Sequence, residues 1–460
     1  MSSFSVLCVV LMACSKNHAE PALPVVPPPV TVDSAFIQYG TPFTKVPDPK
    51  DVIMYQVNFR AFSASGNFSG VQDRLDSIRA LGVNTLYLMP VYPVGVLNSV
   101  NSPYCVKDYM AVNNEFGTIN DLRNLVSEAH KRNMAVLFDW VADHSSWDNS
   151  WINNKSWYLQ DASGNIISPP NTGWLDVAAF NFNNADMRKA MIRAMKYWIY
   201  QTNIDGYRSD AADFAPNDFW VQAIDSLRAV SSHKLLLFAE GTHKDEFTAG
   251  FQLMYGMGFY YNLVNNIHKN NGSVKSIDSV NAVEYSTATT IDEQAVRYIS
   301  NHDVDNSDGT PLDLLGGANG SIAAFVVAAT MKGVPMLYNG QEVACPVKLN
   351  FFNHSTVIDW TINPDIKATY KNILHFRDSS EVLKQGSLVS YNSDNICAFT
   401  KTYQGKVILV LVNLRNAAVS FSVPSNLTNT NWKNAFDGTE YPVGTQLTMQ
   451  PYEYRILNPE

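Results

Sequence analysis

Short apolar runs alternate with amphipathic segments from about residue 50 to about residue 340, and this alternation is typical of strands followed by helices. The runs are rich in Val, Ile, Leu and aromatic residues. Strands that alternate with helices form parallel sheets, and eight such units favour a closed (β/α)8 TIM barrel over an open doubly wound sheet. The candidate strands, of which 251–255 is the weakest, are 52–59, 83–90, 134–141, 204–210, 234–240, 251–255, 295–301 and 333–340.

The segments between these runs carry helix signals. In 69–82, Ser69 and Gln72 have the spacing of a capping box. Thr118 is the expected N-cap of the next helix. In 185–201 apolar residues recur at helical intervals, which predicts a helix with one buried face formed by Met187, Met191, Ala194 and Trp198.

Two regions depart from this alternation. Residues 145–183 are irregular and rich in Trp, Asn and Gly, so we expect an insertion there. After about residue 382 the pattern changes to short β-rich runs separated by turn signals. We therefore expect a barrel over 49–382 and a C-terminal antiparallel β-sandwich over 383–460.

Composition narrows the function classes. The chain has 460 residues, which fits a large barrel plus an accessory module. A net charge of −9 argues against nucleic acid and suits a neutral substrate. Aromatic residues make up 12% of the chain, and they can fill a core or face sugar rings.

The first residues read MSSFSVLCVVLMAC, an apolar run too short to span a membrane. This start resembles a bacterial lipoprotein signal over 1–14 with Cys14 as the lipidated residue, although no Lys or Arg precedes the run. Residues 15–48 are rich in proline and predict an extended tether. We expect a cell-envelope lipoprotein in the outer membrane, at the surface or in the periplasm, with secretion as the alternative.

The remaining cysteines are scattered, so they form neither a zinc motif nor a disulfide framework. We expect these three residues to be buried thiols: Cys105, Cys345 and Cys397.

Three acidic residues, Asp210, Glu240 and Asp303, stand at the ends of apolar runs. A carboxylate in such a place is costly unless it has a partner or a task. The carboxyl ends of barrel strands share one face, which carries the active site. Three carboxylates on that face suit glycoside hydrolysis. Each motif alone also fits a structural Arg–Asp pair, a solvated glutamate or a structural histidine.

Four motifs carry a family resemblance, and they follow one another in the family's order. They are DWVADH at 139–144, GYRSDAADF at 206–214, FAEG at 238–241 and SNHD at 300–303. The chain from about residue 50 to 460 resembles the α-amylase family, glycoside hydrolase family 13. In that family the stretch 145–183 would be the inserted domain B, here a short one.

The resemblance implies a role for each motif residue. Asp210 would be the nucleophile, Glu240 the general acid/base, and Asp303 the residue that stabilises the oxocarbenium-like transition state. Closing the site next to two carboxylates would raise the pKa of Glu240. Arg208 would pair with the nucleophile, and the other residues that bind substrate would be Tyr104, His144 and His302.

The chain also departs from the family pattern. Many α-amylases bind a structural calcium, but here Asp143, Ala179 and Phe214 occupy three of the expected ligand positions. Only Asp143 offers a ligand atom, so calcium stays open with Asp143 as the candidate, and no cofactor is needed for the chemistry. Asp213 replaces a frequent lysine on the leaving-group side.

These observations predict a retaining hydrolase that cleaves α-glucosidic, mainly α-1,4, bonds of starch-like glucans or malto-oligosaccharides. Within the family, an α-glucan transglycosylase or an α-1,6-preferring enzyme would use the same residues. A non-catalytic glucan-binding surface protein is the alternative of another class. A metal-dependent hydrolase lacks a supporting motif such as HExxH. We expect an α-glucan partner, no nucleic acid, and membrane contact only through the lipid anchor.

Overall fold

The computed structural model describes residues 36–243 and 245–459. The predicted signal peptide, its Cys14 and most of the predicted tether therefore lie outside the described residues. The described end of that tether, 36–48, packs against the barrel: the Tyr39 backbone N–H donates to the Tyr200 carbonyl at 2.8 Å, and the Phe43 ring stacks on His130 at 4.3 Å. In the part of the chain that is described, no helix has the length and apolarity needed to cross a membrane.

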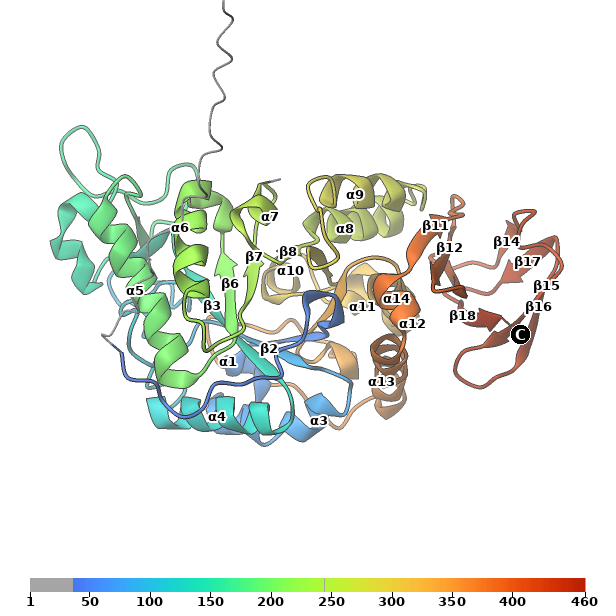
Figure 1. The fold of residues 1–460 in the computed structure, drawn as a ribbon, viewed down its shortest axis with the longest axis horizontal. Coiled ribbons are helices and arrows are strands. Elements are labelled where there is room, and N and C mark those ends of the chain that lie inside the picture. The colour runs from blue at the N-terminus through green and yellow to red at the C-terminus, as the bar shows by residue number, and fades with distance from the viewer. Residues whose placement is uncertain (1–35, 244, 460) are drawn as a thin grey trace, which may run out of the picture. The chain divides into compact units, whose positions relative to one another are not determined.

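Within the described residues, eight parallel strands close into a barrel in the order β1–β10–β9–β8–β7–β6–β3–β2 (Figure 1). Every predicted run supplies one strand, including the weak run at 251–255, so the predicted (β/α)8 barrel is confirmed. The strands are β1 (Met54–Val57), β2 (Thr85–Leu88), β3 (Ala135–Val141), β6 (Gly206–Asp210), β7 (Leu236–Ala239), β8 (Leu253–Tyr255), β9 (Gln294–Arg297) and β10 (Val334–Tyr338).

Helices connect these strands and lie around the barrel (Figure 1). The longer ones are α4 (Ile119–Lys131), α5 (Ala185–Thr202), α6 (Asn217–Arg228), α9 (Ser276–Glu284), α12 (Gly317–Thr330) and α13 (Pro364–Ser379). The shorter ones are α1 (Phe59–Phe62), α2 (Phe68–Gln72), α3 (Leu75–Arg79), α7 (Glu246–Ala249), α8 (Met257–Tyr261), α10 (His302–Ser307), α11 (Pro311–Leu314) and α14 (Glu381–Gln385). The barrel part of the chain also contains a π-helical segment and 3-10 turns: η5 (Asn262–Lys269), η1 (Pro49–Asp51), η4 (Ala212–Phe214) and η6 (Gln341–Val343).

Two of the three helix predictions hold. Thr118 caps α4, and the Asp121 side chain reciprocates in a capping box. The predicted apolar face of α5 is buried. The capping box at Ser69 is wrong: the segment forms two short helices, α2 and α3, and the side chain of Asn67 caps α2 by accepting from the Gly70 N–H. The Ser69 hydroxyl donates to Asn67 Oδ1 at 2.9 Å, so Ser69 supports the cap from inside the first turn.

The irregular stretch after β3 is anchored by a small antiparallel pair, β4 (His144–Ser146) with β5 (Val177–Ala179). Two 3-10 turns, η2 (Ser150–Asn153) and η3 (Lys155–Trp157), lie between these strands. Because His144 begins β4, this pairing fixes the backbone of a predicted site residue at the rim of the barrel.

The C-terminal part is antiparallel, as predicted. One sheet has the order β11–β12–β13–β18–β15–β16, and a second sheet pairs β14 with β17. The strands are β11 (Ser387–Ser390), β12 (Ile396–Tyr403), β13 (Lys406–Asn413), β14 (Val419–Ser422), β15 (Thr430–Asn434), β16 (Glu440–Val443), β17 (Gln446–Met449) and β18 (Tyr454–Pro459). The apolar runs did not predict β15, β16 and β17, whose outward-facing residues are mostly polar.

The three cysteines of the described region, Cys105, Cys345 and Cys397, are buried and free. The prediction of buried thiols is therefore confirmed for them.

Candidate active site

A cavity of about 580 Å³ opens at the carboxyl ends of the barrel strands. Six of the predicted site residues line it: Tyr104, His144, Asp210, Glu240, His302 and Asp303. They come from segments as far apart as residues 104 and 303, and the barrel brings them together because its strands end on one face. The seventh, Arg208, lies beneath the cavity and is fully buried.

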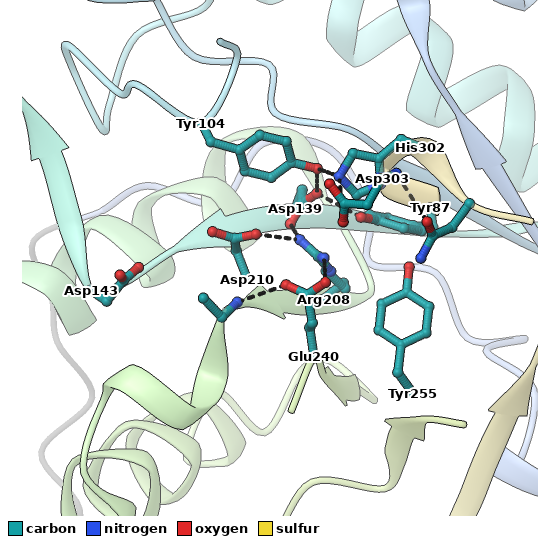
Figure 2. Close-up of polar contacts among 12 residues, drawn as sticks. Tyr87, Tyr104, Asp139, Asp143, Arg208, Asp210, Glu240, Tyr255, His302 and Asp303 are labelled. Carbon is teal, nitrogen blue, oxygen red and sulfur yellow. Dashed lines mark hydrogen bonds and ion pairs between the residues drawn. The ribbon is translucent and has the colours of Figure 1, made fainter. Parts of the chain in front are cut away.

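Arg208 is the centre of the site (Figure 2). Its Nη1 contacts Asp210 Oδ1 at 2.8 Å and Asp139 Oδ1 at 2.6 Å, and its Nη2 contacts Glu240 Oε1 at 2.6 Å. Arg208 and Asp210 are two residues apart on β6 and therefore share one face of the strand. The predicted Arg208–Asp210 pair is present, and the guanidinium also holds two further carboxylates.

The chain turns sharply after Asp210. Ala211 has a φ of +42°, a left-handed conformation that is strained for a residue with a side chain. The turn aims the Ala211 N–H at Glu240 Oε2, at 2.9 Å, and the Ala212 N–H donates to the Glu240 carbonyl at 2.7 Å. Glu240 is therefore held from both sides, by Arg208 and by the backbone that follows Asp210.

Burial changes the ionisation of the site. It raises the pKa of Asp210 well above its ordinary value; the Arg208 guanidinium opposes this, while the carboxylates of Glu240 and Asp139 add to it. Burial also raises the pKa of Asp303, to about 6. The Asp303 side chain is 51% accessible through the open cavity, so solvent moderates that rise. Burial thus favours the protonated form of both Asp210 and Asp303.

His302 is held in a neutral form. Burial and the nearby Arg208 lower the pKa of His302 to about 3. Gln56 Nε2 contacts His302 Nδ1 at 2.8 Å, and the Tyr104 hydroxyl contacts Nε2 at 2.5 Å. The Tyr104 ring stacks on the His302 ring at 5.2 Å. These two residues form one rigid wall of the cavity (Figure 2).

His144 lies next to Tyr104, and its Nε2 contacts the Tyr104 carbonyl at 3.3 Å. Burial lowers the pKa of His144, but the neighbouring Asp143 carboxylate outweighs burial and raises it overall. His144 Nδ1 contacts Asp143 Oδ2 at 2.8 Å. The pair sits at the start of β4, where His144 faces the cavity.

Sequence reasoning did not assign a role to several residues beneath the cavity. Asp139 contacts Arg208 and accepts hydrogen bonds from the hydroxyls of Tyr87, at 2.6 Å, and Tyr104, at 2.8 Å. Gln56 positions His302 from β1. Gln56, Tyr87 and Asp139 are polar residues within apolar barrel strands, and that pattern is the signal that could have identified them.

The residues present do not fit the calcium site that the family resemblance implies. Asp143 Oδ1 is buried without a partner, which is the one feature that suits a cation. Ala179 offers no side-chain ligand, and Phe214 packs on Trp174 at 5.3 Å. Asp143, His144 and Asp210 place ligand atoms within 4.8 Å of one another. However, calcium prefers six or more oxygen ligands, and Asp210 is already bound to Arg208.

The sequence matches two known family models. Residues 43–165 and 171–373 match the model of the alpha amylase catalytic domain, and residues 387–456 match the maltogenic amylase C-terminal domain. The chain is 24% identical to a cyclomaltodextrinase of Thermoanaerobacter pseudethanolicus over 76% of this chain and 63% of that protein. It is 25% identical to alpha-amylase 2 of Dictyoglomus thermophilum over 89% of this chain and 73% of that protein.

A solved structure has the same fold. The maltogenic alpha-amylase AmyB of Thermotoga neapolitana superposes with a TM-score of 0.78 at 24% identity, covering 90% of this chain and 99% of that one. The match to the catalytic-domain model spans well over half of the sequence and includes Asp139, Asp210, Glu240 and Asp303. The chain therefore belongs to the alpha-amylase family.

Proposed function

We propose that the protein is a retaining glycoside hydrolase that cleaves α-glucosidic, mainly α-1,4, bonds of starch-like glucans or malto-oligosaccharides. One observation carries this proposal: Asp210 and Glu240 are bound to the same buried guanidinium at the edge of a cavity that Asp303 also lines. Relatives named cyclomaltodextrinase and maltogenic alpha-amylase support the substrate class.

The reaction proceeds in two displacements. Asp210 attacks the anomeric carbon, Glu240 protonates the departing glycosidic oxygen, and a covalent glycosyl–enzyme intermediate forms. Glu240 then takes a proton from water, which attacks the intermediate and releases a product of unchanged anomeric configuration. Arg208 contacts both carboxyls, and the reactive form carries the charge on Asp210 and the proton on Glu240.

The surrounding residues bind the sugar. Asp303, half accessible to the cavity, accepts hydrogen bonds from sugar hydroxyls and favours the oxocarbenium-like transition state. His302 and His144 line the same cavity. The Tyr104 ring provides an apolar face for the sugar that reacts.

The test replaces the nucleophile. Asp210→Asn keeps the size of the side chain and removes the attacking charge, so it should abolish release of reducing ends from soluble starch while the protein stays folded by circular dichroism. Asp225→Asn on the exposed side of α6 is the matched control and should keep full activity. Starch cleavage by Asp210→Asn at the wild-type rate would refute the assignment.

We also propose a cell-envelope location through a lipid on Cys14, supported by the LMAC sequence that resembles a lipoprotein signal. Metabolic labelling with a radioactive fatty acid should mark the wild type and leave Cys14→Ser unlabelled. Equal labelling of both, or of neither, would contradict the proposal.

A further inference from the structure

The segment that directly follows Glu240 is tied down by one carboxylate. Asp213, which lies on the turn after Asp210, accepts from the Thr242 N–H at 2.9 Å, the Thr242 hydroxyl at 3.0 Å and the His243 N–H at 3.2 Å. Asp213 and Gly241 both line the cavity. Asp213 therefore links the loop after β6 to the loop after β7, on the leaving-group side of the proposed chemistry.

A second carboxyl, Glu246, is buried behind this link. Glu246 is the first residue of α7 and is 5% exposed. Neither of its carboxyl oxygens accepts a hydrogen bond from a described residue. A buried carboxylate without a partner is strongly disfavoured. A protonated carboxyl, in contrast, can itself donate a hydrogen bond.

The acceptor for that proton is Asp213. A Cβ built on Gly241 would lie 1.6 Å from Glu246 Oε1 and 2.5 Å from Asp213 Oδ1, so the two carboxyl groups converge on the same point beside the Gly241 backbone. Any other residue at 241 would separate them. When two carboxyls lie this close, one of them keeps its proton more readily, because two adjacent negative charges repel each other.

The charges that the described residues place around Glu246 act in one direction. Burial, then Asp213, Asp245 and Glu240, raise the pKa of Glu246 to about 9. His243 Nδ1 lies 3.3 Å from Asp213 Oδ1, and the His243 side chain is 60% exposed. This contact is made to Asp213 and not to Glu246.

We propose that Glu246 is a positioning residue: its protonated carboxyl donates a hydrogen bond to Asp213, Asp213 holds residues 241–243 beside Glu240, and loss of the proton at alkaline pH releases this segment. The proton passes to solvent base, and no covalent bond changes. The catalytic readout of this inference rests on the proposed glycosidase function.

The experiment measures kcat and KM for maltotriose hydrolysis from pH 6 to pH 10 in four proteins: the wild type, Glu246→Gln, Glu246→Leu and Glu440→Gln. The wild type should lose kcat with a midpoint near pH 9. Glu246→Gln still donates to Asp213 and cannot ionise, so it should keep kcat at pH 7 and lose the decline near pH 9. Glu246→Leu cannot donate, so its kcat should fall roughly tenfold at every pH. Glu440→Gln, on exposed β16, should match the wild type.

Thermal unfolding provides a readout that needs no activity. In the folded protein Glu246 keeps its proton up to about pH 9, whereas in the unfolded chain it loses the proton near pH 4.5. As the pH rises from 4.5 to 9, the wild type should therefore lose stability relative to Glu246→Gln. The difference in Tm should therefore be near zero at pH 5 and widen in favour of Glu246→Gln by pH 8.

Two results would overturn the inference: an alkaline decline in Glu246→Gln equal to that of the wild type, or a Tm difference that does not change with pH. Equal activity of Glu246→Leu and Glu246→Gln would show that the hydrogen bond to Asp213 does not position the segment. If the wild type cleaves no glucan, the proposed function fails, and the Tm series still decides whether Glu246 is protonated.

Discussion

Two pairs of acidic residues lie at or shortly after the carboxyl ends of β6 and β7, and they differ in what compensates their charge. Asp210 and Glu240 share the guanidinium of Arg208. Asp213 and Glu246, only a few residues further along the chain, contact no guanidinium among the described residues and converge beside Gly241. The same residue types therefore serve different purposes in the two pairs. Beside Arg208, a carboxylate can keep its negative charge and take part in chemistry. Without a cation, one carboxyl keeps its proton and can serve as a hydrogen-bond donor that supports the loop.

The largest expected effect comes from removing the cation from the first pair. Arg208→Met leaves three carboxyls around a buried apolar side chain. We expect loss of detectable glucan cleavage and a decrease in the free energy of unfolding of about 3–5 kcal/mol at pH 7. Urea unfolding measures the second quantity.

The loss of stability should shrink toward pH 4, because Asp210, whose pKa burial raises, is then protonated and no longer needs the cation. Arg193→Met, on the exposed side of α5, is the control and should unfold like the wild type. If Arg208→Met unfolded at the wild-type urea concentration, Arg208 would not be what compensates the buried carboxyls.

A smaller effect is expected at Asp303, which belongs to neither pair and is half open to the cavity. Its pKa is raised to about 6, so its carboxylate is lost as the pH falls below that value. KM for maltotriose should therefore rise as the pH falls from 7 toward 5. In Asp303→Asn this dependence should disappear, with a higher KM throughout. A KM that varies with pH equally in both proteins would exclude Asp303 as the titrating group.

The smallest effect is expected from chelation. The residues at the family's calcium positions include Ala179 and Phe214, which have no ligand atoms in their side chains. Adding a chelator should leave both Tm and starch cleavage unchanged. A Tm that falls with chelator and recovers with calcium would show that Asp143 and further groups hold the ion.

The apolar runs predicted the barrel because each buried strand is a continuous hydrophobic segment, and even the three-residue β8 could be placed. They did not predict the break between α2 and α3. The helical spacing of buried apolar residues in α2 continues into α3 with Leu75 and Ile78, so the pattern shows no interruption. The runs also missed β15, β16 and β17, because their residues are polar or half exposed on one face.

The sequence predicted those site residues that lie in a local motif. Asp210, Glu240 and Asp303 each follow an apolar run, and the structure brings them to one cavity. The contact between Arg208 and Glu240 joins two different strands, so no local spacing encodes it. The approach of Glu246 to Asp213 depends on the path of two loops and could not be inferred from the sequence.

The central claim is that Asp210 becomes covalently bonded to the sugar. The most direct measurement incubates the protein with a 5-fluoro-α-glucosyl fluoride, which slows release of the intermediate, and then maps the modified peptide by mass spectrometry. The account predicts a single glucosyl adduct on Asp210, and none in Asp210→Asn. An adduct on another carboxylate, or turnover whose first product has the inverted anomeric configuration, would contradict it.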